Sequence, residues 1–157
     1  MSGFRRGVRL GIDVGRARVG VARSDPDGML AVPVETVPRS EESLARIAQI
    51  AADYEPIEFV VGLPVNMQGA DTPSTSDARE FAGALQRLTS VPVRLMDERL
   101  STVSAHAALR SSGRTQRNSR SIVDQVAAVV LLQHAIDTEK STGSPAGTAL
   151  PTTEEPS

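Results

Sequence analysis

The segment VRLGIDVGRARVGVARS, residues 8–24, decides the fold. Apolar residues alternate with polar or small ones over residues 8–14 and again over residues 19–24, and alternation with period two is typical of a β-strand. Arg16 and Ala17 form a short turn between the two stretches. The segment therefore predicts two neighbouring strands at the start of the chain.

The pattern outside this segment changes from strands alone to alternating helices and strands. A third strand is expected at 29–37, with Pro33 favouring a sheet edge or a bulge. Strands are then predicted at 57–62 and 91–96, and helices at 40–55, 74–88, 101–109 and 121–138, with a basic loop at 114–120. This order predicts a three-layer α/β fold whose mixed five-stranded sheet has three antiparallel strands and then parallel ones, flanked by helices.

Length and local composition predict one domain followed by a tail. A chain of 157 residues is long enough to bury one core without metals or disulfides. We expect a single domain over residues 1–140. The segment 141–157 is rich in Ser, Thr, Gly, Pro and Ala, so we expect it to be disordered. No targeting segment or membrane-spanning apolar run is visible, which favours a cytoplasmic protein.

Composition excludes several classes of site. The chain has no Cys, which excludes disulfides, Cys-ligated zinc and a thiol nucleophile. It has no Trp and few other aromatic residues, which argues against binding single strands by stacking bases on a row of rings. Motifs of P-loop proteins, zinc proteases and serine hydrolases are also absent from the sequence.

Charge is segregated along the chain although the formal net charge is only -2. Residues 1–23 sum to +5 and residues 94–120 to +4, whereas residues 24–80 sum to -8. The positive charges are 16 arginines and one lysine, and arginine suits bidentate contact with phosphate. We therefore expect nucleic acid to bind one local basic face.

Asp13 is the first acidic residue that stands out. It lies near the end of an otherwise apolar strand, where a buried carboxylate is costly unless it is paired or bound to a metal. Gly11, Gly15 and Gly20 surround it, so backbone or ligand can approach closely. The alternative interpretation is an ordinary aspartate at the end of a strand.

Asp97 and Glu98 follow the predicted strand at 91–96, where open α/β sheets place their ligands. Adjacent residues of a strand face opposite ways, so only one of the two should face a site. The residues alone leave that choice open. The alternative is that both acids only favour the start of the next helix.

Asp124 is the third candidate acid. It lies in helical register with Ala128, Leu131 and Ala135, a stripe that should face the sheet. The alternative is a helix cap, because Ser121 and Asp124 have nearly the spacing of a capping box.

Four segments taken together resemble the YqgF/RuvX family of ribonuclease H-like nucleases, also described as pre-16S rRNA nucleases or Holliday junction resolvase-like proteins. They occur in the family's order within residues 8–137. The segments are GIDVG (11–15) with GVARSD (20–25), VVGLP (60–64) with NMQG (66–69), DERLST (97–102), and DQVAA (124–128).

This resemblance implies a ribonuclease H-like fold and a catalytic site for two metal ions, Mg2+ or Mn2+. It implies Asp13, Glu98 and Asp124 as the catalytic, metal-binding acids, and the preference for Glu98 over Asp97 rests on the family. We further expect phosphate contacts from arginines of the basic segments: Arg16, Arg18, Arg99, Arg114, Arg117 and Arg120.

The expected function is a hydrolase that processes the 5′ end of pre-16S rRNA in ribosome biogenesis, with structured RNA and ribosomal precursor particles as partners and no membrane. One alternative is an endonuclease acting on four-way DNA junctions, which normally requires a symmetric dimer, whereas we expect a monomer or weak homodimer. A second is a non-catalytic RNA-binding ribosome assembly factor. A third, a sugar kinase or ATPase of the actin–hexokinase type, needs two such domains.

Overall fold

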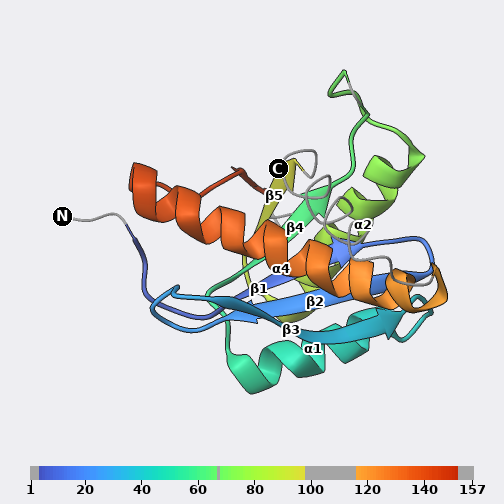
Figure 1. Cartoon of the computed structure of the whole chain (residues 1–157), viewed down its shortest axis with the longest axis horizontal. Helices are drawn as coiled ribbons and strands as arrows, with labels where there is room; N and C mark the ends of the chain where they lie inside the picture. Colours follow the sequence, from blue (N-terminus) through green and yellow to red (C-terminus); the bar gives the residue numbers. More distant parts are fainter. Residues whose placement is uncertain (1–3, 67, 98–115, 152–157) are drawn as a thin grey trace.

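The computed structural model describes residues 4–66, 68–97 and 116–151, with the side chains of the last range described from Gln125 onward (Figure 1). Its elements follow the predicted order. They are β1 (Arg9–Val14), β2 (Arg18–Ser24), β3 (Ala31–Pro38), α1 (Ser43–Tyr54), β4 (Glu58–Leu63), α2 (Pro73–Thr89), β5 (Val93–Asp97), α4 (Gln116–Thr142) and β6 (Thr148–Ala149).

The sheet is mixed and has the strand order β3-β2-β1-β4-β5-β6. β1, β2 and β3 pair antiparallel, while β1, β4 and β5 pair parallel. This confirms the predicted fold class and adds a sixth strand, β6, which pairs antiparallel with β5. Pro33 lies in the edge strand β3, at a register shift in the pairing of β2 with β3, as its ring and missing N–H require.

Helices cover both faces of the sheet (Figure 1). Residues such as Leu10 and Ile12 of β1 pack with α1 and α2 in the larger core cluster. The other face packs against α4, whose apolar stripe forms a second cluster with Val60 and Met96. Because strand side chains alternate, β2, β3, β4 and β5 contribute to both clusters, and the sheet is the middle of three layers.

Gly11 allows α4 to lie close to β1. A Cβ at this position would lie 2.8 Å from Cβ of Leu132 and 2.9 Å from the carbonyl oxygen of Ala128. Any larger side chain would therefore push the helix away from the sheet. Gly11 thus fixes the height of α4 above β1, and it marks the face of β1 that the helix covers.

The start of α2 is stabilised by residues typical of a helix amino terminus. Pro73 occupies the first turn of α2, where its missing N–H costs nothing. Thr72 and Thr75 form a reciprocal capping box at that end.

α4 begins earlier than expected, because residues 116–120 of the predicted basic loop are helical. Those residues are polar and have no apolar stripe, so their pattern did not indicate a helix. The helix predicted at 101–109 lies outside the described residues.

The end of the chain also differs from the expectation. Residues 141–151 include the last turn of α4 and the strand β6, and Leu150 packs against the larger core cluster. The composition of this segment favours disorder, but pairing with the sheet supplies contacts that composition does not reveal. Residues 152–157 lie outside the described part. Among the described residues, no helix is long and apolar enough to span a membrane.

Candidate catalytic site

Asp13 lies near the carboxyl end of β1 and is half-buried. It is paired with Gly20 of β2, and Gly20 is paired with Thr36 of β3, so the three residues form one row across the sheet. Gly11, two residues earlier, faces α4. Since side chains alternate along a strand, Asp13 belongs to the same face as Gly11, with a glycine as its neighbour on β2.

α4 runs antiparallel to β1 along this face. Its carboxyl end meets the start of β1, where Glu139 accepts hydrogen bonds from Arg9. Its middle covers Gly11. Nearer its start, Gln125 donates a 2.8 Å hydrogen bond to the hydroxyl of Thr36, in the row of Asp13. These contacts follow the same order along β1 and, in reverse, along α4, so the amino-terminal part of α4 reaches the row of Asp13.

The pairing at the end of β5 places Asp97 on one face of the sheet. Leu63 of β4 pairs with Asp97, and Gly62 pairs with Met96. Met96 packs in the cluster beneath α4, whereas Leu95 packs in the cluster beneath α1 and α2. By alternation, Asp97 shares the face of Leu95, which is opposite to the face of Asp13. Asp97 is therefore poorly placed to share a site with Asp13.

The other predicted acids are described in part or not at all. Glu98 lies outside the described residues, and Asp124 is described only as a position in α4, directly before Gln125 and one turn before Ala128. Within the described part of the chain, no three His, Asp or Glu side chains form a group suited to a metal ion. The three-acid site therefore stays a prediction.

The predicted phosphate-binding arginines are also only partly described. Arg99 and Arg114 lie outside the described residues, and Arg117 and Arg120 are described only as positions in α4. Arg18 begins β2. The exposed Arg16 stands in the turn between β1 and β2 and lines an open hollow of about 590 Å3, together with Arg39, Ser40, Glu41, Pro73 and Asp77.

Arg39 is a residue that the sequence reasoning missed. Its guanidinium donates a 2.8 Å hydrogen bond to the carbonyl of Gly15, two residues beyond Asp13. It also donates two 2.9 Å bonds to Asp77 of α2 and lies over the ring of Phe81. The hydrogen bond from Arg39 lowers the pKa of the Asp77 carboxyl. Arg39 thus fixes the turn after Asp13 to α2, a role that no local pattern could have indicated.

The opposite end of the α4–β1 pair holds a buried ionic cluster, which we call the Arg9 cluster: Arg5, Arg9, Glu58 and Glu139. Arg9 and Glu139 are almost fully buried, and their closest charged atoms are 3.2 Å apart. Arg5 contacts Glu139 at 2.8 Å and Glu58 at 3.1 Å. Burial raises the pKa of Glu139, but hydrogen bonds from Arg5 and the nearby charge of Arg9 outweigh burial and lower the pKa to about 2. These four residues carry two positive and two negative charges, which balance.

The mixed sheet, the aspartate near the end of its central strand and the helix crossing it define a ribonuclease H-like protein. Among solved structures, the chain is similar to Thermus thermophilus RuvC in complex with a Holliday junction substrate, with a TM-score of 0.56 and 18% identity. The match covers 92% of this chain and 99% of that one. A second RuvC structure from the same organism matches with a TM-score of 0.55. At this identity the likeness concerns the fold.

Sequence comparison identifies the family. The model of the RuvX family, described as Holliday junction resolvase, matches residues 7–138, and the chain belongs to this family. A relative from Clavibacter michiganensis is 54% identical over 151 residues, covering 94% of each chain. One from Nocardioides is 55% identical over 150 residues, covering 92% of this chain and 96% of that one. Both carry the name "Putative pre-16S rRNA nuclease". The family resemblance is thereby confirmed.

Proposed function

We propose that the protein is a metal-dependent nuclease that hydrolyses phosphodiester bonds of RNA and processes the 5′ end of pre-16S rRNA. The observation that carries the proposal is the position of Asp13. It stands near the end of the central strand, in a row that the start of α4 reaches, in a chain of the RuvX family. Relatives that share 50–55% of its residues carry the name of a pre-16S rRNA nuclease.

The proposed donor set is Asp13, Glu98 and Asp124. All three offer carboxylate oxygens, which Mg2+ and Mn2+ prefer as ligands. Asp124 is the position in α4 directly before Gln125, whose side chain bonds to the row of Asp13. Glu98 directly follows Asp97, the last residue of β5, and its place in the donor set rests on the family resemblance. The chemistry of these three side chains therefore suits a pair of divalent cations.

The bound cations would stabilise negative charge on the phosphate and lower the pKa of a bound water to generate the nucleophile. The residues of the chain itself position the carboxylate of Asp13 and bind the phosphates of the substrate. Arg39 holds the turn beyond Asp13 through its bond to the carbonyl of Gly15, so the carboxylate is presented on a fixed backbone. Arg16 is exposed in that turn and is suited to a phosphate flanking the cut. Arg99, Arg114, Arg117 and Arg120 extend this proposed contact along the substrate.

A four-way DNA junction is the second candidate substrate, because the family model carries the description Holliday junction resolvase. Paired cuts in a four-way junction call for two symmetric sites in one dimer. We favour structured RNA because the sequence offers no obvious apolar surface for such a dimer. Sedimentation distinguishes the candidates, since a monomer that cuts RNA supports the first and a stable dimer that cuts junctions supports the second.

The test measures cleavage of an RNA that contains the 5′ leader of 16S rRNA, with and without Mg2+. The wild-type protein is expected to cut it only with the metal, and Asp13→Asn is expected to lose this activity. Asp137→Asn is the matched control, because it removes the same charge from an exposed position of α4. Equal cleavage by the wild type and Asp13→Asn would contradict the assignment. Binding of the RNA without cleavage by the wild type would instead favour a non-catalytic assembly factor.

A further inference from the structure

The two edges of the sheet are protected in different ways. An unprotected edge strand offers unpaired N–H and C=O groups to any other extended chain. The β3 edge carries Pro33 and Pro38, which cannot donate to such a partner. β5 has no proline. Its outer side is covered by the carboxyl-terminal segment 146–151, which contains β6 (Figure 1).

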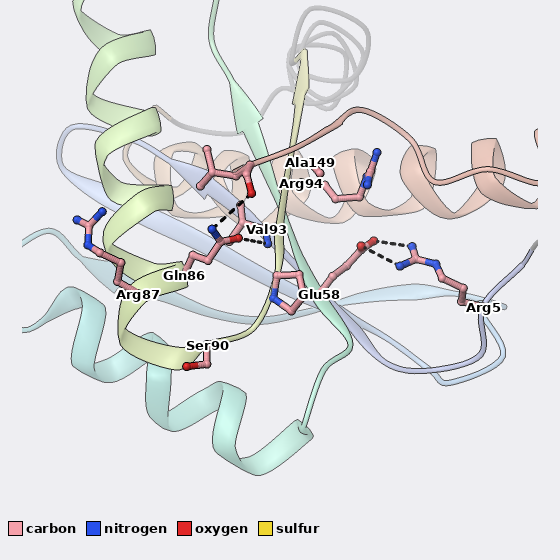
Figure 2. A pocket seen from close by; sticks show the side chains of 10 residues that line it. Arg5, Glu58, Gln86, Arg87, Ser90, Val93, Arg94 and Ala149 are labelled. Carbon is pink, nitrogen blue, oxygen red and sulfur yellow. Dashed lines mark hydrogen bonds and ion pairs between the residues drawn. The ribbon is translucent and has the colours of Figure 1, made fainter. Parts of the chain in front are cut away.

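The backbone of this segment is bound by two side chains. The amide of Gln86 donates to the carbonyl of Leu150 at 3.4 Å, while its oxygen accepts from the N–H of Val93 (Figure 2). The same amide also donates to the carbonyl of Pro151, at 3.1 Å. Arg94 of β5 donates to the carbonyls of Ala146 and Gly147, at 2.7 and 2.9 Å. These contacts bind the main chain of the segment in one conformation.

A third set of contacts comes from the strands themselves. The N–H of Leu150 donates a 2.9 Å bond to the carbonyl of Val93. Ala149 and Thr148 pair with Arg94 and Leu95 of β5 in antiparallel register. An extended peptide that adds a strand to a sheet edge is commonly recognised in this way.

The edge also selects particular side chains. Gly147 has a φ of +74°, and a Cβ at this position would collide with the carbonyl oxygen of Leu95. Leu150 packs against the larger core cluster. Thr148 and Ala149 between them are exposed. The edge therefore accepts a segment with glycine at one position and an apolar side chain three residues later.

The bound segment does not fill all the space beside β5. A cavity of about 300 Å3 remains beside it, lined by Ala149 and Leu150 of the segment and by Arg5, Glu58 and Gln86, among other residues (Figure 2). The connection from α4 passes through Gly143, whose φ is +80°. The segment is thus attached to α4 by a short glycine-containing connection.

We propose that the outer edge of β5, together with Gln86 and Arg94, is a binding site for an extended peptide with the pattern Gly-x-x-Leu. The chain fills this site with its own residues 146–151, and a vacated site takes the same segment from a second copy of the chain. A second copy of the chain is the proposed partner because it carries the sequence that the edge selects. The proposal is independent of the nuclease activity.

The test uses the full chain with Gly147→Val, which displaces the segment without changing the packed layers. A fluorescent peptide with the sequence of residues 143–151 is titrated against this variant, the wild type and Thr148→Val, a control at an exposed position. We expect saturable binding to Gly147→Val. Binding to the wild type and the control should be at least about tenfold weaker, because an attached segment competes at high effective concentration. A peptide carrying the same glycine-to-valine change should not bind.

Equal titration curves for wild type and Gly147→Val, or no binding to either, would overturn the proposal. If Gly147→Val does not fold, amide hydrogen exchange of the wild type decides instead. The Leu150 amide should be protected but should exchange by a local opening, well before amides of β1. Exchange of Leu150 together with β1 would contradict a replaceable segment, and an unprotected Leu150 would contradict binding at the edge.

Discussion

The two ends of the α4–β1 pair use carboxylates in opposite ways. At one end, Glu139 is buried against Arg5 and Arg9, and its charge is balanced within the Arg9 cluster. At the other end, Asp13 is half-buried beside Gly20, near the carboxyl end of the central strand. The same helix and strand thus carry a charge pair that holds the layers together and a carboxylate suited to a ligand. The comparison indicates that position along one helix–strand pair decides whether an acid is neutralised by buried arginines or remains suited to a ligand, and the proposed function assigns Asp13 to the second case.

The largest effect is expected from Glu139→Gln. This change leaves the buried Arg9 without its closest carboxylate, and breaking a buried ion pair typically costs about 3–5 kcal/mol. Urea unfolding should show a loss of this size. Asp137→Asn, an exposed change two residues earlier, should alter the unfolding free energy by less than about 0.5 kcal/mol. Equal stability of the two variants would mean that the Arg9 cluster does not hold the layers together.

The second-largest effect is expected on cleavage, from Glu98→Gln compared with Asp97→Asn. Asp97 shares the face of Leu95, opposite to Asp13, so the proposed site needs Glu98 and not Asp97. Glu98→Gln should reduce Mg2+-dependent cleavage about 100-fold, which corresponds to roughly 3 kcal/mol of transition-state stabilisation. Asp97→Asn should change it by less than about threefold. The opposite ranking in a single-turnover cleavage assay would reverse the assignment of the two acids.

Acid should weaken the Arg9 cluster over a defined pH range. The pKa of Glu139 is lowered to about 2 from the usual value of 4.5. A lowered pKa stabilises the folded state at pH values above the usual one, and this stabilisation is lost as pH falls from about 4.5 toward about 2. The stability difference between wild type and Glu139→Gln should therefore shrink on acidification in that range. A difference that does not depend on pH would show that the ionised form of Glu139 is not what stabilises the fold.

A smaller effect is expected from Arg39→Lys. Lysine keeps the charge but cannot bond Asp77 through two nitrogens while also holding the carbonyl of Gly15. Because the Arg39–Asp77 pair is partly exposed, the unfolding free energy should fall by only about 1 kcal/mol. Cleavage should fall in kcat more than in KM, since the turn beyond Asp13 becomes less fixed. An unchanged kcat with a raised KM would instead indicate that Arg39 binds substrate.

The fold was predictable where side-chain periodicity carries the information. Alternation in residues 8–24 indicated the first two strands, and the later helices and strands followed from their own periodicity. The start of α4 was missed because residues 116–120 have no apolar stripe. The strand β6 was missed because it is held by backbone contacts, which amino-acid composition does not reveal. Gln86 and Arg94 bind the backbone on either side of β6, and β6 itself pairs with β5.

The candidate site was predictable only in part. Asp13 stood out because a carboxylate near the end of an apolar strand is unusual. The face on which Asp97 lies follows from the packing of its neighbours Leu95 and Met96 in different clusters, which local sequence does not contain. The preference for Glu98 rests on the family resemblance and stays a prediction. Arg39 acts through contacts with Gly15 and with Asp77, which are distant from it in sequence. Long-range register and long-range hydrogen bonds are therefore the information that the amino-acid pattern lacks.

The most direct test of the central claim is the affinity of the protein for Mn2+, measured by electron paramagnetic resonance of the free ion. The wild type and Asp137→Asn should bind Mn2+ with the same affinity, because Asp137 is exposed and away from the row of Asp13. Asp13→Asn should bind at least about tenfold more weakly, since loss of even an indirect metal contact costs that much. Equal Mn2+ affinity of Asp13→Asn and the wild type would contradict a metal site at this end of the α4–β1 pair.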